Sequence, residues 1–211
     1  MRIILVAALA LLLAPTPGRA ENPITIVAFG DSLTAGYQLG PDEGFAERLQ
    51  AKLAARGQDV TIVNAGVSGD TTSGGLARLD WSVPADADGV ILELGGNDAL
   101  RGIDPATTEA NPDRMLTQLS ERAIPVLLAG MRAPPNMGAD YEAQFNPIFQ
   151  RLASRHDAIY YPFFLDGVAG EPAYGLGDGI HPNAAGVDVI VDKILPSVEK
   201  LIARIERRSP S

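Results

Sequence analysis

The chain contains no cysteine, and this absence excludes several kinds of site at once. A disulfide framework, a thiolate zinc site and a cysteine nucleophile all require that residue. Histidine is scarce as well, with two residues, so few side chains are available as a general base near neutral pH. Aromatic residues make up 6% of the chain, with one tryptophan, which disfavours an open, aromatic-rich cleft for carbohydrate.

Positive charge is also in short supply relative to negative charge. The 211 residues include 17 Lys and Arg against 26 Asp and Glu, for a formal net charge of −9. Such acidity disfavours nucleic acid and anionic membrane surfaces as electrostatic partners. It places no constraint on a neutral small molecule, and the composition predicts no oligomeric state.

The N-terminal segment has the pattern of a secretory signal. Arg2 precedes an apolar run over residues 3–14, which is short for a membrane span of about 20 residues. Residues 15–20 then break the helix and end in small residues. We therefore expect a signal peptide at residues 1–20, cleavage after Ala20 and an exported, periplasmic or secreted bacterial protein; an uncleaved anchor is the alternative. The mature chain would carry a net charge of −11, because Arg2 and Arg19 are the only charged residues removed.

Strand-like and helical segments alternate over residues 24–205, and the length favours one domain over residues 21–211. Apolar, β-branched runs predict strands at residues 24–29, 60–63, 89–94, 125–129 and 158–161. Amphipathic spacing predicts helices at residues 43–56, 71–79, 112–122, 139–155 and 187–205, the third capped by Asn111 with Pro112 first. Apolar strands that are each followed by a helix predict an α/β fold, a three-layer α/β/α sandwich around a parallel sheet of about five strands.

Polar motifs follow the first three expected strands. Ser32, Gly66 and Asn97 come directly after them, at the carboxyl edge where parallel sheets bind ligands. A strand-to-helix turn at Ser32 would expose its hydroxyl and leave backbone N–H groups free beside it for an oxyanion. The pattern differs from a Gly-x-Ser-x-Gly elbow, because Thr34 replaces the second glycine. The competing interpretation is that Ser32 caps a helix.

Gly66 and Asn97 are candidates to stabilise an oxyanion. Gly66 has no Cβ to block the approach of its N–H to a substrate oxygen, and Asn97 can donate from its amide. An ordinary turn glycine and a turn or cap asparagine are the alternatives.

The segment 178–182, Asp-Gly-Ile-His-Pro, supplies the partners of a nucleophilic serine. His181 can accept the proton of Ser32, and Asp178 can orient the imidazole, which gives a triad in the chain order Ser, Asp, His. A loop histidine at a helix entry is one alternative. A metal site formed by Asp178 and His181 is another, disfavoured because no further His or Cys ligand accompanies them. The second histidine, His156, ends an expected helix, and we interpret it as structural.

The four motifs together resemble the GDSL, or SGNH, hydrolases. The segments 30–33, 95–98 and 178–182 and the single residue Gly66 look like the four blocks of that family, in the same order. Residues 64–71, 95–102 and 180–183 are similar, beyond those blocks, to the exported bacterial multifunctional esterases with thioesterase, lysophospholipase and arylesterase activities. The resemblance implies a flavodoxin-like SGNH fold and a serine esterase that forms an acyl-enzyme and needs no cofactor or metal.

The resemblance also implies individual roles. Ser32 would be the nucleophile, His181 the base and Asp178 its orienting partner, with Ser32 N–H, Gly66 N–H and the Asn97 side chain as oxyanion hole. The expected substrates are small-molecule or lipid esters, such as aryl, short or medium acyl and lysophospholipid esters, and acyl thioesters. Apolar residues near the motifs are candidates to line an acyl site: Leu33, Leu100 and Ile103, with Met131 or Met137. Alternatives are a carbohydrate O-acetyl esterase on the same fold and a non-catalytic exported binding protein. A flavodoxin-like nucleotide binder is disfavoured, because residues 30–33 lack the glycines and lysine of a phosphate loop.

Overall fold

A single parallel sheet forms the centre of the computed structural model, which describes residues 23–208. Its order is β2-β1-β3-β4-β5, and every neighbouring pair is parallel. The strands are β1 (Ile24–Gly30), β2 (Val60–Gly66), β3 (Gly89–Glu93), β4 (Val126–Ala129) and β5 (Ile159–Tyr161). The strand order runs outward in both directions from β1, so the crevice between the ends of β1 and β3 is the switch point where such sheets bind ligands.

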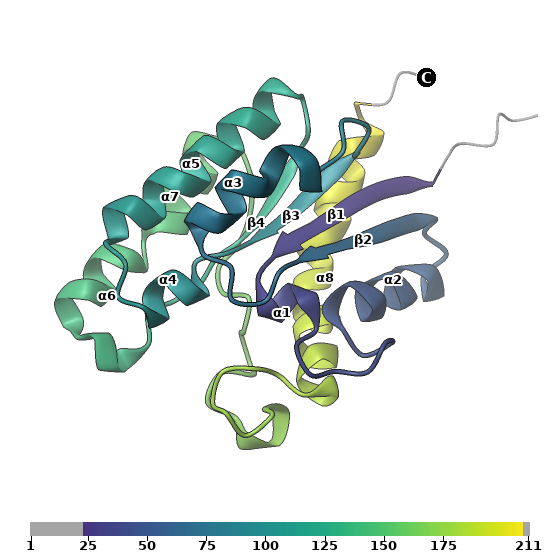
Figure 1. Ribbon diagram of the computed structural model, residues 1–211. Helices are drawn as coiled ribbons and strands as arrows, with labels where there is room; N and C mark the ends of the chain where they lie inside the picture. Colours follow the sequence, from purple (N-terminus) through teal and green to yellow (C-terminus); the bar gives the residue numbers. More distant parts are fainter. Residues whose placement is uncertain (1–22, 209–211) are drawn as a thin grey trace, which may run out of the picture.

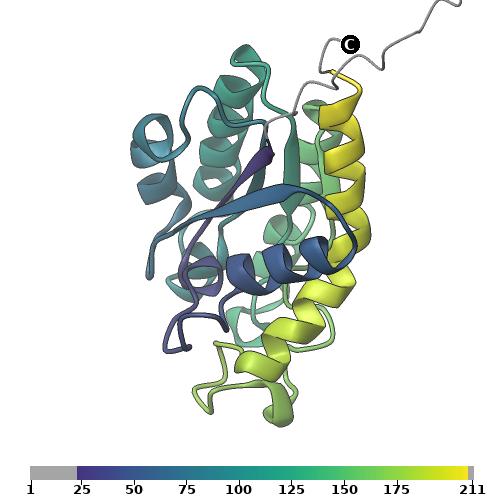
Figure 2. The same cartoon turned by 90° about the vertical axis from the view of Figure 1, so that its right-hand side faces the viewer.

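Helices cover both faces of the sheet, which confirms the predicted three-layer α/β/α sandwich (Figures 1 and 2). One layer contains α2 (Phe45–Ala55) and α8 (Ala184–Glu206), and the other contains α3 (Thr72–Ser82), α5 (Pro105–Glu121) and α7 (Ile148–Arg155). Shorter segments are α1 (Ser32–Ala35), α4 (Gly96–Leu100), α6 (Ala139–Phe145) and the 3₁₀ turns η1 (Pro135–Met137) and η2 (Pro172–Tyr174). The loop that leads into α8 lies at the same end of the molecule as α1 (Figure 1).

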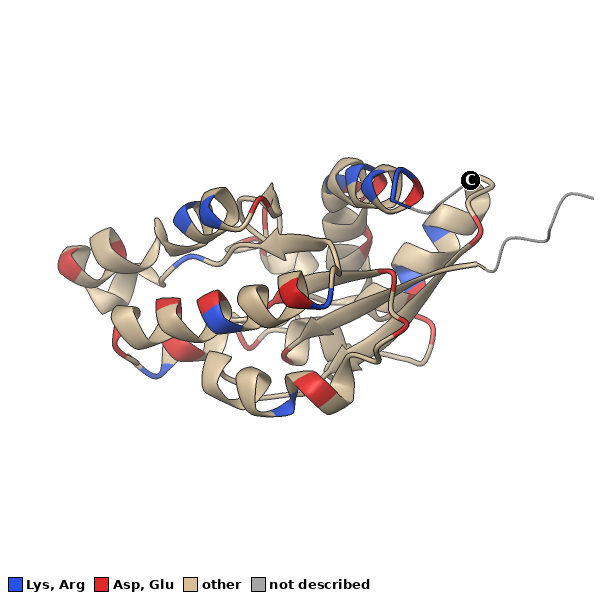
Figure 3. Ribbon diagram, turned by 90° about the horizontal axis from the view of Figure 1, so that it is seen from above, with Lys and Arg blue, Asp and Glu red and all other residues tan. Residues whose placement is uncertain are grey.

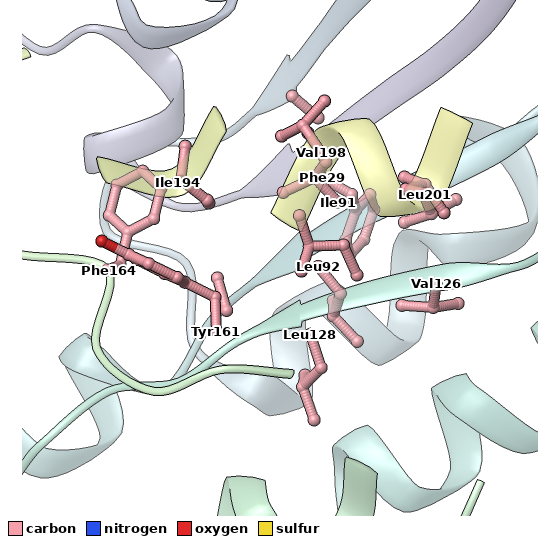
Figure 4. Packing of buried hydrophobic residues seen from close by; sticks show 14 of the residues in the cluster. Phe29, Ile91, Leu92, Val126, Leu128, Tyr161, Phe164, Ile194, Val198 and Leu201 are labelled. Atoms are coloured by element: carbon pink, nitrogen blue, oxygen red, sulfur yellow. The ribbon is translucent and has the colours of Figure 1, made fainter. Parts of the chain in front are cut away.

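The predicted apolar stripe of the last helix forms one side of the core. Ile194, Val198 and Leu201 of α8 belong to this core (Figure 4), on the side of the sheet where Leu201 and Ile205 lie next to Gly89 of β3. These side chains are buried. Burial of each such side chain is worth about 1.5–3 kcal/mol, so this contact firmly anchors α8, and with it the loop that precedes it.

Two helix predictions need correction. The helix expected at 112–122 begins at Pro105, because the side chain of Asp104 caps it by accepting the Ala106 N–H (2.7 Å). Pro112 lies inside this helix, and Asn111 is not a cap: its amide donates sideways to hydroxyls at the start of α3. The helix expected at 139–155 is two helices, α6 and α7, separated at Asn146 and Pro147.

Charged residues occur mainly on the helices and loops that surround the sheet (Figure 3). Within residues 23–208, no helix combines the length and apolar character needed to cross a bilayer. The expected signal peptide at residues 1–20 lies outside the described residues.

Candidate active site

Ser32 is the first residue of α1, directly after β1. The residue that caps this helix is Asp31, whose Oδ1 accepts the Leu33 N–H (3.0 Å), so the alternative role of Ser32 as the cap is wrong. The Ser32 N–H donates no hydrogen bond within the described residues. Gly36 then ends the turn in the left-handed conformation, at φ 77°. The turn thus presents the Ser32 hydroxyl and an available N–H together.

The loop before α8 brings Asp178 and His181, the other two candidate triad residues, to Ser32. The Nε2 of His181 lies 2.9 Å from Ser32 Oγ, and its Nδ1 lies 2.6 Å from Asp178 Oδ2. The other carboxylate oxygen of Asp178 accepts the N–H groups of Ile180 and His181, both at 2.9 Å. These backbone N–H groups and the imidazole lower the pKa of Asp178 to about 2. Asp178 is therefore ionised throughout the neutral range and holds Nδ1 protonated, which leaves Nε2 to accept the serine proton.

An aromatic contact that the sequence analysis missed supports the imidazole. The ring of Tyr37 lies against that of His181, with centroids 4.4 Å apart and planes tilted by 37°. Gln38 Nε2 donates to the Tyr37 hydroxyl (3.0 Å). His181 lines the cleft described below, whereas Tyr37 does not. Tyr37 therefore packs against the imidazole from outside the cleft.

Of the three predicted oxyanion donors, Ser32 N–H and the Asn97 amide each have a hydrogen without a partner in the described residues. The Asn97 amide, at the start of α4, donates to Asp31 Oδ2 (3.0 Å), and its second hydrogen has no partner within the described residues. Gly66 N–H instead donates to Asn64 Oδ1 (3.0 Å), so it must leave that partner to serve an oxyanion. In the loop after β2, Gly69 is in the left-handed region at φ 80°, and its N–H has no partner within residues 23–208. Sequence reasoning did not single out Gly69.

A buried arginine joins the end of β1, which precedes the Ser32 turn, to the end of β2, which contains Gly66. Arg78 of α3 donates to Gly30 O (2.8 Å) and Ala65 O (2.9 Å) and forms an ion pair with Asp70 (2.6 Å). Its guanidinium also lies 4.0 Å from the centroid of the Phe29 ring. Arg78 therefore fixes the carboxyl ends of β1 and β2 relative to each other.

Two buried carboxyl groups lie directly beneath the serine turn. Asp31 is 1% exposed and Glu93, at the end of β3, is fully buried. Glu93 Oε2 accepts the Thr34 hydroxyl (2.8 Å) and the Asp31 N–H (3.4 Å). Burial raises the pKa of Asp31 to about 6 and raises that of Glu93 far above its usual range, helped by the nearby charge of Asp31.

A cleft of ≈ 840 Å³ opens at Ser32 and His181. Of the apolar candidates, Leu33, Leu100 and Met131 are among its lining residues. Ile103 is not among its lining residues; its carbonyl accepts the Tyr141 hydroxyl (2.7 Å) behind the cleft. Met137 does not line it either. Most other lining side chains are apolar, so the cleft suits an apolar acyl group next to the serine.

The second histidine lies outside this site. His156 Nε2 contacts Asp113 Oδ1 (2.8 Å), between α7 and α5, where Arg155 also pairs with Asp113. Within residues 23–208, no three His, Cys, Asp or Glu side chains are grouped as metal ligands.

Comparison with known proteins places this geometry in a family. A model of the GDSL-like Lipase/Acylhydrolase family matches residues 28–189. The esterase TesA of Pseudomonas aeruginosa is 36% identical over 201 residues, which are 95% of this chain and 98% of the relative. The thioesterase 1/protease 1/lysophospholipase L1 of Escherichia coli K12 is 35% identical over 185 residues, 87% and 88% of the two chains. The crystal structure of AlinE4, an SGNH-hydrolase family esterase, is 44% identical with a TM-score of 0.73 and covers 86% of this chain and 98% of its own.

Proposed function

Because the chain belongs to the GDSL-like lipase/acylhydrolase family and is an ester-hydrolysing enzyme, we propose that Ser32, His181 and Asp178 perform its chemistry. The observation that carries this proposal is the continuous chain of contacts from Ser32 Oγ through the imidazole to the Asp178 carboxylate, at 2.9 and 2.6 Å, opening on an apolar cleft.

The first half of the reaction transfers the acyl group to the protein. Ser32 Oγ attacks the ester carbonyl carbon while its proton moves to His181 Nε2. The carbonyl π electrons move to oxygen, and the resulting oxyanion accepts hydrogen bonds from Ser32 N–H and Asn97 Nδ2. When the intermediate collapses, the bond to the leaving group breaks and His181 returns its proton to that oxygen or sulfur. Asp178 remains ionised and stabilises the imidazolium during both transfers.

The second half returns the enzyme to its starting state. A water molecule loses a proton to His181 Nε2 and attacks the acyl-enzyme carbonyl, forming a second oxyanion at the same donors. Collapse releases the carboxylic acid, and Ser32 Oγ regains its proton from His181. Gly66 N–H is the proposed third oxyanion donor, and it must leave Asn64 Oδ1 to take this role.

The substrates that fit are esters and thioesters with an apolar acyl group. The apolar lining beside Ser32 supports short or medium acyl and aryl esters, and the names of the relatives add thioesters and lysophospholipids as candidates. We further propose that residues 1–20 direct export and are removed, so that the active enzyme begins at Glu21.

The test is hydrolysis of p-nitrophenyl esters with acyl chains from two to sixteen carbons, by protein beginning at Glu21. Ser32→Ala is expected to abolish turnover, whereas Ser154→Ala, which removes an exposed serine hydroxyl on α7, is the matched control and should retain it. Acyl-CoA hydrolysis can be followed with a thiol reagent, because the chain has no cysteine to contribute a background signal. Full activity in Ser32→Ala would remove Ser32 as nucleophile. N-terminal sequencing of exported protein tests the cleavage site, and a chain beginning at Met1 would contradict it.

A further inference from the structure

The proposed mechanism leaves two buried carboxyl groups, Asp31 and Glu93, without a role. Neither forms an ion pair within the described part of the chain. The nearest buried cation, Arg78, directs its donors to Asp70, to Ser82 and to the carbonyls of Gly30 and Ala65. Two carboxylates buried without a cation cannot both remain charged, because the cost of burying an unpaired charge is met by keeping a proton instead.

The hydrogen bonds show which of the two carries the charge. Asp31 accepts two N–H groups, from Leu33 and from the Asn97 amide, both at 3.0 Å, which favours its ionised form. Glu93 accepts the Thr34 hydroxyl and one long backbone contact, and its Oε1 is buried with no partner in the described residues. Glu93 Oε2 lies 3.4 Å from the Asp31 backbone nitrogen, so the two residues are in contact. Glu93 is therefore the member that keeps the proton.

We propose that Asp31 and Glu93 form a buried acid pair that shares one proton and positions the oxyanion hole through Asn97. Glu93 donates to Asp31 and holds its carboxylate. Asp31 Oδ2 then fixes one Nδ2 hydrogen of Asn97, so that the other hydrogen points at the developing oxyanion. Both are positioning residues, and the inference rests on the proposed roles of Ser32 and Asn97.

The charges around the pair set its response to pH. Besides Asp31 and Glu93 themselves, the charged or titratable groups that face it are His181 from the loop before α8, and Asp70 with Arg78 from α3 and the loop before it. An imidazolium at His181 lowers the pKa of Asp31, and Asp70 raises it. An Asp31 carboxylate therefore also favours the charged His181 that forms during acyl transfer.

A double-mutant cycle tests whether Asp31 acts through Asn97. Asp31→Asn keeps a good helix cap. The new asparagine side chain has one oxygen, which can accept from either Leu33 N–H or the Asn97 amide. Its NH₂ group then faces the other donor, and that hydrogen bond is lost. We expect kcat to fall on the order of a hundredfold with KM within about twofold, as for loss of an oxyanion donor. In an Asn97→Ala background, the same change is expected to cost less than about threefold, because the group it positions is absent.

Variants of Glu93 test the other half of the pair. Glu93→Leu removes its hydrogen bonds and is expected to lower kcat, whereas Glu93→Gln, which has the shape of the protonated acid, is expected to recover most of it. Ile205→Ala is the control for lost stability, because Ile205 packs at Gly89, the amino end of β3, away from the site. It is expected to lower the unfolding midpoint and leave kcat unchanged.

Infrared spectroscopy gives a readout that does not depend on turnover. At pH 7 the protein should show the carbonyl band of a protonated carboxylic acid, and this band should disappear in Glu93→Gln. Additive effects in the Asp31 and Asn97 cycle, or no such band at pH 7, would overturn the proposal even if Ser32→Ala is inactive. Full activity in Ser32→Ala would instead remove the proposed function on which it rests.

Discussion

Replacement of Arg78 by methionine tests the contacts through which this side chain joins the ends of β1 and β2. Arg78 and Asp70 are both nearly buried, with side chains 7% and 11% exposed. The change fills the space with an apolar side chain but leaves the Asp70 carboxylate without its cation and two strand-end carbonyls without their donor. Removal of one partner from a buried ion pair costs about 3–5 kcal/mol. For a chain of this size, that lowers the melting temperature by roughly 6–20 °C.

Urea unfolding followed by circular dichroism is the assay, with the free energy of unfolding compared at constant m-value. Arg114→Met, at an exposed position on α5, is the matched control and should change stability by less than about 0.5 kcal/mol. Adding Asp70→Asn to Arg78→Met removes the uncompensated charge and should recover at least about 1 kcal/mol. A loss below about 1 kcal/mol in Arg78→Met, or strictly additive effects in the two-residue cycle, would refute the reasoning.

Three further predictions address other contacts. Tyr37→Leu should lower kcat about twofold to tenfold at unchanged KM, because an aromatic pair worth about 0.5–1.5 kcal/mol holds the His181 imidazole. Tyr37→Phe should restore kcat, and an effect confined to KM would count against this role. The pKa of Asp178 falls from 3.8 to about 2 on folding, so its stabilising contribution is fully present above about pH 4 and is lost as pH falls toward 2. Amide exchange at His181 N–H measures this, and loss of protection already at pH 5 would be inconsistent with it. Asp98→Asn should cost about 1–3 kcal/mol in urea unfolding, because buried Asp98 accepts from Thr72 N–H (2.9 Å) and from the hydroxyls of Thr72 and Thr108. An unchanged midpoint would contradict it.

The strands and the positions of the proposed site residues were predictable because their signals are local. Each strand is a short apolar run bounded by turn residues, and the five expected strands match the observed ones to within a few residues. Ser32, Asn97 and His181 occur at the ends of such runs or at a helix entry. Parallel strands end at one edge, so the fold brings these residues together once the strand order is set.

Helix boundaries were less predictable because the sequence offers more than one possible N-cap residue for the same helix. Asn111 before Pro112 and Asp104 before Pro105 are equivalent signals in sequence, and both pairs suit a helix start. Packing against α3 decides between them: the Asn111 amide is used by Thr72 and Ser73, and the helix continues through Pro112. Only the tertiary structure contains that information.

The residues beneath the site were not predictable because their partners are distant in sequence. Arg78 reaches Gly30 across 48 positions, and Glu93 reaches Asp31 across 62. In the sequence, Arg78 is one charged residue in an amphipathic helix, and Glu93 is a single polar residue in an apolar strand. The signal available was that Glu93 interrupts a run of Val, Ile and Leu, since a buried ionisable residue in a central strand requires a partner or a proton.

The placement of these groups explains how a rigid sheet edge can serve a reaction in which charge develops and disappears. Oxyanion donors stabilise a transition state only if they are oriented before the charge forms. Ser32 N–H is oriented by the helical turn itself, but an asparagine side chain can rotate, and Asn97 needs a fixed acceptor.

The charge state of Asp31 and Glu93 decides how well they provide that acceptor. Two charged carboxylates would repel the oxyanion and each other, and two neutral acids would hold the Asn97 amide weakly. One shared proton avoids both problems, because a single negative charge anchors Asn97 and favours the His181 imidazolium. Arg78 keeps the strand ends in register while satisfying Asp70, so its charge is not available to neutralise the pair.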